Sequence, residues 1–216
     1  MQSKISVTGV ILAGGLARRM GGQAKPLIAL GEISILSRVI EVLRPQCAYL
    51  SLNANTELHR YHLYQLPILR DAVDGFLGPL AGVLAGMDAA AENQSDINLL
   101  LSAPGDTPFL PQDLVARLYA AKTKAQASIA VAASGGRAHH TVALWDISLR
   151  ESLRNALINE GVRAVSEFIA RHKKVDVDWS LDPYDPFFNV NSPEDLQIAG
   201  EILVKRKMII REMPVG

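Results

Sequence analysis

The sequence predicts an α/β protein: one domain in which a mostly parallel sheet lies between two layers of helices, as a three-layer α/β/α sandwich. Strand-like and helix-like segments alternate along almost all of the 216 residues, which is typical of strands joined by crossover helices. The length suits a single domain, since about 150 residues is a common domain size. The run 97–101 is the most apolar strand candidate, which indicates a central strand buried on both faces.

Each expected strand is a short apolar or β-branched run that ends near turn-forming residues. In chain order the expected strands span 6–12, 48–52, 66–69, 97–101, 128–133, 141–145 and 174–178. The pair 128–133 and 141–145 flanks Gly135 and Gly136, which predict a tight turn between them.

The expected helices combine apolar residues at helical spacing with recognisable start signals. These signals are Ser34, Pro79, Pro111, the capping-box pair Ser148 and Glu151, and the run Ser192-Pro193-Glu194-Asp195. Gly161 is expected to separate the helix that follows Ser148 from another that carries Val162 and Phe168.

Composition excludes several classes of protein. The 22 Lys and Arg balance 22 Asp and Glu, whereas a protein that coats nucleic acid normally has a basic excess. Cys47 is the only cysteine, which excludes an internal disulfide and any zinc or iron–sulfur site with several thiolates. Because the sequence has no apolar run of membrane-spanning length and no signal-peptide pattern, we expect a cytoplasmic protein that contacts neither membrane nor nucleic acid.

The loop after the first strand, 12–26, reads LAGGLARRMGGQAKP. Its four glycines can present bare backbone N–H groups to an anion, while Arg18, Arg19 and Lys25 can neutralise phosphate oxygens. Ligands bind at the carboxyl ends of strands in parallel sheets, so this loop predicts a triphosphate cradle. It fits neither G-x-G-x-x-G nor G-x-x-x-x-G-K-[ST], and the alternative is a glycine-rich surface turn with solvated arginines.

The loop resembles the L-A-G-G-x-x-x-R-M-G signature, followed by lysine, of nucleotidyltransferases with a Rossmann-like fold. Within them it is most similar to the guanylyltransferase family of molybdenum cofactor biosynthesis. Segments similar to further motifs of that family follow in the expected order: GPLAG at 78–82, PGDTP at 104–108 and FNVNSPE at 188–194.

The resemblance implies transfer of GMP from GTP to the molybdenum–molybdopterin cofactor, forming the guanine dinucleotide cofactor and pyrophosphate, with Mg²⁺ as the metal cofactor. It also implies protein partners: other molybdenum-cofactor biosynthesis proteins and acceptor molybdoenzymes. One alternative is a nucleotidyltransferase with another NTP or acceptor, either a molybdopterin cytidylyltransferase or a sugar-phosphate nucleotidyltransferase. Another is a GTP-binding chaperone or adaptor that presents the cofactor without making it.

The resemblance also assigns roles to individual residues. Those implied to bind GTP are Leu12, Ala13, Gly14, Gly15, Arg19, Lys25, Asn53, Asp71 and Asp106. Lys25 and Asp106 would be catalytic, and Asp106 would hold the metal. The residues implied on the acceptor side are Arg163, Asn189 and Asn191.

The residues themselves leave alternatives open at these positions. A carboxylate at the end of a strand suits Mg²⁺, but Asp106 could instead cap the helix expected at Pro111. Asp71 could accept hydrogen bonds from N1–H and the amine of guanine, or lie in a surface turn. Asn53, like Asn55, could simply form a turn. Asn189 and Asn191 could orient the metal or an acceptor phosphate, or cap the last helix.

We expect one nucleotidyltransferase domain over 1–216, with a nucleotide-binding half at about 1–110, an acceptor-binding half at about 111–204 and a C-terminal tail at 205–216. His139, His140 and Thr141 match the family's H-P-T segment except that His140 stands where proline is usual. Two adjacent histidines on a strand point to opposite faces, so they are a poor metal pair.

Overall fold

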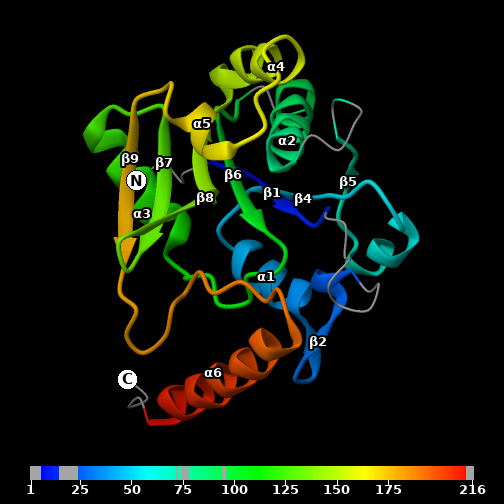
Figure 1. The fold of residues 1–216 in the computed structure, drawn as a ribbon, viewed down its shortest axis with the longest axis vertical. Helices are drawn as coiled ribbons and strands as arrows, with labels where there is room; N and C mark the ends of the chain where they lie inside the picture. Colours follow the sequence, from blue (N-terminus) through cyan, green and yellow to red (C-terminus); the bar gives the residue numbers. More distant parts are fainter. Residues whose placement is uncertain (1–5, 15–23, 72, 74–77, 94–95, 213–216) are drawn as a thin grey trace.

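A seven-stranded sheet forms the centre of the computed structural model, which describes residues 6–14, 24–71, 73, 78–93 and 96–212 (Figure 1). The strands are β1 (Thr8–Leu12), β4 (Tyr49–Asn53), β5 (Ile68–Leu69), β6 (Leu99–Pro104), β7 (Ile129–Ser134), β8 (Arg137–Asp146) and β9 (Lys174–Trp179). Their order across the sheet is β5-β4-β1-β6-β8-β7-β9. β8 runs antiparallel to both neighbours, and the other adjoining pairs are parallel. The mostly parallel sheet is as predicted.

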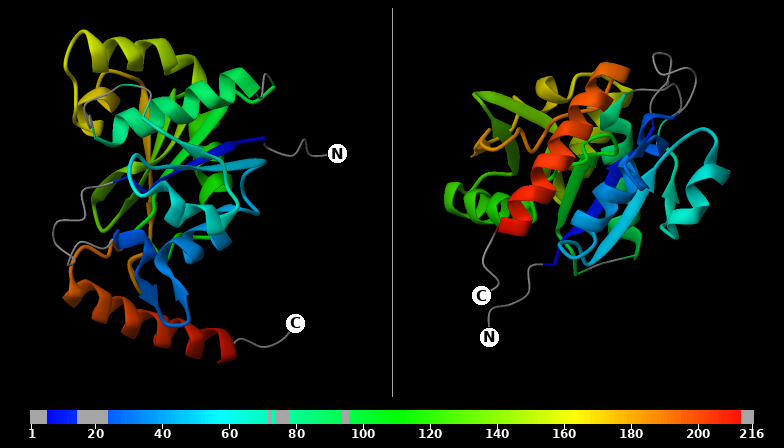
Figure 2. Two further views of the ribbon diagram at one scale, coloured as in Figure 1. Left: turned by 90° about the vertical axis from the view of Figure 1, so that its right-hand side faces the viewer. Right: turned by 90° about the horizontal axis from the view of Figure 1, so that it is seen from below.

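Helices cover both faces of the sheet, which confirms the three-layer prediction (Figure 2). α1 (Ile35–Leu43) and α3 (Leu114–Ala125) contribute to the core on one face. α2 (Pro79–Asn93), α4 (Arg150–Ile158) and α5 (Val165–Ile169) contribute to the core on the other. α6 (Pro193–Glu212) lies outside the α1 layer, where it packs against a hairpin of β2 (Ala29–Leu30) and β3 (Ile33–Ser34). Among the described residues, no helix is long and apolar enough to cross a membrane.

The central position of β6 is confirmed, since Leu100 and Leu101 on opposite faces are both fully buried. β1 pairs with β4 and with β6 in matching register, so that Leu12 lies opposite both Asn53 and Pro104. The carboxyl ends of these three strands are therefore level at one edge of the sheet. That edge is where a parallel sheet binds its ligands.

Most of the expected helix starts are confirmed. The Ser34 side chain accepts a hydrogen bond from the backbone N–H of Ser37 at 3.0 Å, and α2 begins at Pro79. At the start of α6, Ser192 Oγ accepts from the N–H of Asp195 at 3.2 Å, while Asp195 Oδ2 accepts from that of Ser192 at 3.0 Å. This reciprocal pair is a capping box with aspartate as the acid.

Two expected helix starts are wrong. α3 begins at Leu114 rather than Pro111, and the N–H of Val115 in its first turn donates to the distant Gln46 side chain at 3.0 Å. α4 begins at Arg150 after a 3-10 turn over Ile147–Leu149, and Ser148 does not cap it. In both places tertiary contacts or a tighter turn override the local signal.

β8 is longer than expected because it begins at Arg137 and contains a bulge. Ala132 of β7 pairs with His139, yet its neighbour Val131 pairs with Ala143. Residues 140–142 of β8 therefore lie opposite no residue of β7. Bulges of this kind redirect side chains and occur often beside active sites.

Gly82 allows α2 to approach the end of β4 closely, and replacing it tests that packing. A Cβ at this position would lie 2.3 Å from Asn53 Oδ1 and 2.7 Å from Leu12 Cδ2. We expect Gly82→Ala to lower the free energy of unfolding by about 1–3 kcal/mol, because an overpacked core must shift. Urea denaturation measures this change.

Gly200 of α6 is the matched control, because nothing lies within 4 Å of its hypothetical Cβ. Gly200→Ala should raise stability by roughly 0.5–1 kcal/mol through helix propensity alone. Equal effects of the two substitutions would contradict the close approach at Gly82.

Candidate active site

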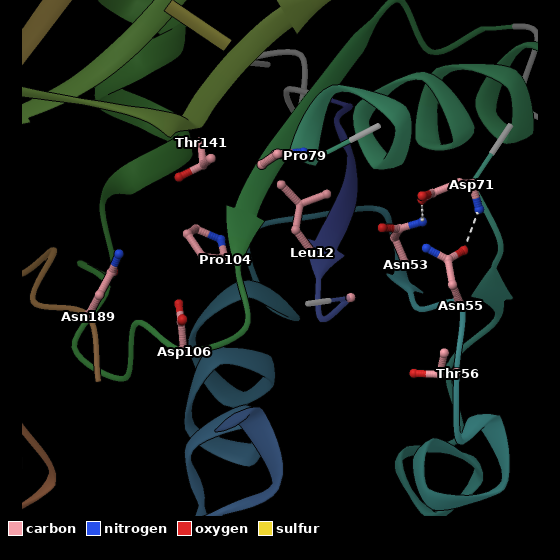
Figure 3. Close-up of a pocket in the computed structure, with 12 residues that line it drawn as sticks. Leu12, Asn53, Asn55, Thr56, Asp71, Pro79, Pro104, Asp106, Thr141 and Asn189 are labelled. Atoms are coloured by element: carbon pink, nitrogen blue, oxygen red, sulfur yellow. Dashed lines mark hydrogen bonds between the residues drawn. The ribbon is translucent and has the colours of Figure 1, made fainter. Parts of the chain in front are cut away.

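A pocket of about 370 Å³ opens at the carboxyl edge of the sheet (Figure 3). It is lined by Leu12, Gly14, Asn53, Asn55, Thr56, Asp71, Gly78, Pro79, Pro104, Asp106, Thr141 and Asn189. These residues come from the ends of β1, β4, β5 and β6 or the loops just after them, from the start of α2 and from two segments late in the chain. The pocket therefore gathers residues that are far apart in the sequence.

One end of the pocket holds a fixed polar group formed by Asn53, Asn55 and Asp71 (Figure 3). Asn53 Nδ2 donates to Asp71 Oδ1 at 3.0 Å and to the carbonyl of Leu69 at 3.3 Å. Asn55 Oδ1 accepts from the backbone N–H of Asp71 at 2.8 Å. Asn53 is only 4% exposed, so it is not a simple surface turn residue. Asp71 is held at both its side chain and its backbone.

Asp106 lies in the loop after β6 with one carboxylate oxygen, Oδ1, fully buried and without a hydrogen-bond partner among the described residues. Burial raises the pKa of Asp106, and the positive charge of Lys25 opposes that rise. The residue at the cap position of α3 is Asp113, so the alternative that Asp106 caps this helix is wrong. A buried carboxylate without a partner is costly, and a cation is the natural ligand for it.

Lys25 begins a 3-10 turn over Lys25–Leu27. Its Nζ donates to Asn191 Oδ1 at 2.8 Å, across 166 positions of sequence. Asn189 accepts from the Thr107 hydroxyl at 2.5 Å, and the N–H of Val190 donates to the carbonyl of Asp106 at 3.0 Å. The segment 189–191 is thus hydrogen-bonded to the loop that carries Asp106. The two asparagines do not cap α6, whose capping pair is Ser192 and Asp195.

The remaining predicted residues divide into three groups. Leu12 and Gly14 line the pocket, and Ala13 lies behind it with its N–H donated to the carbonyl of Asn53 at 2.9 Å. Gly15 and Arg19 lie outside the described residues. The Arg163 guanidinium donates to the carbonyls of Leu157 and Val162 at 2.9 and 2.8 Å, so the structure does not bring it into this set.

Several lining residues were not predicted. Thr56 carries no sequence signal that separates it from an ordinary loop residue, and Pro104, the last residue of β6, was noted only as part of the PGDTP segment and not as a site residue. Thr141 was matched to the H-P-T segment without being assigned to the site, and it lies in the bulge of β8 where that strand reaches the pocket. Asn55 has a role as the holder of the Asp71 backbone, which no local pattern reveals.

The donor set at Asp106 suits a hard divalent cation. Among the described residues, no three His, Cys, Asp or Glu side chains gather as a metal site. A magnesium ion typically needs only one or two protein carboxylates, with substrate phosphates and water as its other ligands. The buried, unpartnered oxygen of Asp106 meets that requirement, because it is the kind of atom that such an ion would satisfy.

Known families and proteins match this chain over most of its length. The MobA-like NTP transferase domain matches residues 9–175. The molybdenum cofactor guanylyltransferase of Rhodopseudomonas palustris (strain BisB5) is 52% identical over 196 residues, which cover 91% of this chain and 93% of that protein.

Solved structures agree on the fold. The molybdopterin-guanine dinucleotide biosynthesis protein A of Archaeoglobus fulgidus aligns with a TM-score of 0.71 and 25% identity, over 92% of this chain and 99% of that one. The 2-C-methyl-D-erythritol 4-phosphate cytidylyltransferase of Thermus thermophilus aligns with a TM-score of 0.68 over 94% and 100% of the two chains. At 18% identity, it supports the fold alone. This chain is a nucleotidyltransferase that belongs to the MobA-like NTP transferase family and, within it, to the molybdenum cofactor guanylyltransferases.

Proposed function

We propose that this protein transfers GMP from GTP to the molybdenum–molybdopterin cofactor, producing the guanine dinucleotide cofactor and pyrophosphate. The observation that carries the proposal is a single pocket with two different ends. One end holds the Asn53–Asp71 pair, and the other holds the buried, unpartnered carboxylate of Asp106. A base and a metal-bound phosphate are the two parts of a nucleotide that such ends would bind.

We assign the recognition of guanine to Asp71. A carboxylate accepts two hydrogen bonds from N1–H and the exocyclic amine of guanine, whereas cytosine offers an acceptor where guanine offers N1–H. Asn53 and Asn55 hold Asp71 in place, so the carboxylate need not reorganise when the base arrives. This arrangement favours GTP over the cytidylyl alternative, because a mismatched base would leave buried polar groups unpaired.

We assign Mg²⁺ to Asp106, as the ion that suits one carboxylate together with phosphate oxygens. When bound, it would neutralise charge on the phosphate oxygens of the nucleotide. Lys25 would add a second positive charge beside the same phosphates, and its bond to Asn191 would fix where that charge lies. Gly14 lines the pocket without a side chain, so the backbone there stays open to the phosphates. Roles for Gly15 and Arg19 in holding the outer phosphates remain predictions from the sequence.

The reaction itself needs no nucleophile from the protein. An oxygen of the acceptor phosphate, already anionic near neutral pH, forms a bond to the α-phosphorus of GTP as the bond to pyrophosphate breaks. The protein's contribution is to position the two phosphates and to neutralise charge. The pocket fits this mechanism, since its described lining contains polar side chains that can bind the substrate but no serine or cysteine that could act as a nucleophile.

We further propose that the nucleotide occupies the half formed by about 1–110 and the acceptor the half formed by about 111–204. Most lining residues fall in the first half, while Thr141 and Asn189 bring the second half to the same pocket. An acceptor contact by Arg163, protein partners in cofactor biosynthesis, and a cytoplasmic location remain predictions from the sequence. No role is assigned to the tail at 205–216.

The assignment of Asp106 predicts that Asp106→Asn separates activity from stability. The amide removes the charged metal ligand, so we expect guanylyl transfer to fall about 100-fold or more. Because burial raises the pKa of Asp106, its charged form disfavours folding, and the neutral amide should leave the unfolding temperature unchanged or higher. Pyrophosphate release across a magnesium titration and thermal unfolding measure the two effects.

Asp96→Asn is the control, since Asp96 is exposed and precedes the same strand at the opposite edge of the sheet. It should alter neither quantity. Full magnesium-dependent turnover in Asp106→Asn would refute the metal assignment.

The assignment of Asp71 predicts a change in base preference. We expect Asp71→Asn to lower kcat/KM for GTP by about tenfold to 100-fold, because an amide cannot accept from both guanine donors. ITP keeps N1–H but lacks the exocyclic amine, so the preference of the wild-type protein for GTP over ITP should shrink in the variant. Pyrophosphate release with GTP, ITP and CTP measures these ratios. An unchanged ratio of GTP to ITP would place the base elsewhere.

A further inference from the structure

A second cavity of about 250 Å³ adjoins the nucleotide pocket. It is lined by Pro104, Arg137, Ala138, His139, His140, Thr141, Val142, Val165, Ser166 and Asn189. Pro104, Thr141 and Asn189 line both cavities, so they form a shared wall. Figure 3 shows these three side chains on the opposite side of Leu12 from Asn53 and Asp71. The second cavity therefore opens at the end of the nucleotide pocket that is remote from the site assigned to the base.

The bulge in β8 forms part of the lining of this cavity. Residues 140–142 are the ones that lie opposite no residue of β7, and all three line the cavity. The bulge is anchored from below, because the fully buried hydroxyl of Ser102 donates to the carbonyl of Thr141 at 2.9 Å and accepts from the indole N–H of Trp145 at 2.9 Å. The cavity is thus a fixed feature of the fold.

The polar side chains that line the cavity differ in whether they already have a hydrogen-bond partner within the protein. His139 Nε2 lies 2.7 Å from the Ser134 hydroxyl, which donates to Asp185 Oδ1 at 2.9 Å. The same Asp185 oxygen accepts the N–H of Phe187 at 2.9 Å, and Asp185 is not among the residues that line the cavity. In the part of the chain that the structure describes, Arg137 is exposed and its side chain has no hydrogen bond or ion pair, while its backbone pairs with Ser134 in the sheet. Arg137 is therefore a cation available to a ligand.

We propose that the second cavity is the acceptor site and that Arg137 and His140 contact the acceptor there. The ligand class is a phosphate monoester of a heterocycle. Its phosphate would lie at the shared wall, within reach of the α-phosphorus, and its body would fill the cavity towards Arg137. Arg137 lies four positions before Thr141 on β8, a distance of at most about 13 Å in extended strand, so Arg137 contacts the body of the acceptor rather than the reacting phosphate. The proposal rests on the proposed function.

Two features favour an acceptor over a second part of the nucleotide. The nucleotide already has a polar site for its base at Asn53 and Asp71 and a site for its metal at Asp106, both within the first pocket. An in-line displacement also requires the attacking group to approach from the side opposite the leaving pyrophosphate. A cavity that meets the first pocket at one wall provides that separate approach. His140 adds a ring N–H at a position where the family motif carries proline, which has none.

Two substitutions test the proposal at lining residues from two different elements, β8 and α5. Arg137→Ala removes the cation, and Ser166→Asp introduces a carboxylate from α5, at an exposed position in the first turn where an acid is tolerated. In both variants we expect the KM for molybdopterin to rise about tenfold or more, while the KM for GTP changes by less than about twofold. Equilibrium binding of molybdopterin, quantified by pterin fluorescence after separation of free ligand, should weaken in parallel without any need for turnover.

Arg44→Ala is the matched control, since Arg44 is exposed at the end of α1 and lines neither cavity. Thermal unfolding confirms that each variant folds. The assignment of the cavity is overturned if molybdopterin binding is unchanged in Arg137→Ala and Ser166→Asp, or if the KM for GTP rises as much as that for molybdopterin. In either case an active wild-type protein still supports the proposed function. A wild-type protein that neither binds molybdopterin nor releases pyrophosphate with it overturns both.

Discussion

The register of β1 is the constraint on which the site depends. Leu12 lies opposite Asn53 on one side and Pro104 on the other, and the pairing continues for one more residue beyond the strands. The N–H of Ala13 donates to the carbonyl of Asn53, and the N–H of Gly105 donates to that of Leu12. A shift by one residue would turn Asn53 to the opposite face of the sheet. The level strand ends therefore determine that the residues assigned to base and metal share one pocket.

The charges of the site are not fully neutralised by the protein's own side chains, which favours the binding of a charged ligand. Lys25 is hydrogen-bonded to a neutral amide, Asn191, while one oxygen of Asp106 stays buried without a partner among the described residues. Burial raises the pKa of Asp106, and the positive charge of Lys25 opposes that rise only in part. Such an arrangement lowers stability, but it leaves the charge of the lysine available to phosphate and the aspartate oxygen available to a cation. Active sites commonly accept this loss of stability for function.

Periodicity and start signals in the sequence predicted the sheet, the central strand and most helix starts, because these depend on local patterns of burial and capping. The expected start of α3 at Pro111 was wrong, and the first turn of this helix makes a contact that no local pattern reveals, because Gln46, distant in sequence, accepts from the N–H of Val115. The hairpin of β2 and β3 has two residues in each strand, too few for any period. Within the site, Asn53, Asp71 and Asp106 could be picked out as strand-end residues, whereas the bond from Asn55 to Asp71 depends on folding alone.

The segment 189–191 explains how distant parts of the chain complete one site. It alternates like a strand, so that Asn189 and Asn191 face the loops of Thr107 and Lys25. Val190 is fully buried between them, in the cluster that includes Phe109 and Leu203 of α6. Apolar packing of one residue thus sets the positions of two polar neighbours, one at the wall shared by both cavities and one at the lysine assigned to the phosphates. The packing of α6 against the body of the protein is in this way coupled to the geometry of the reaction site.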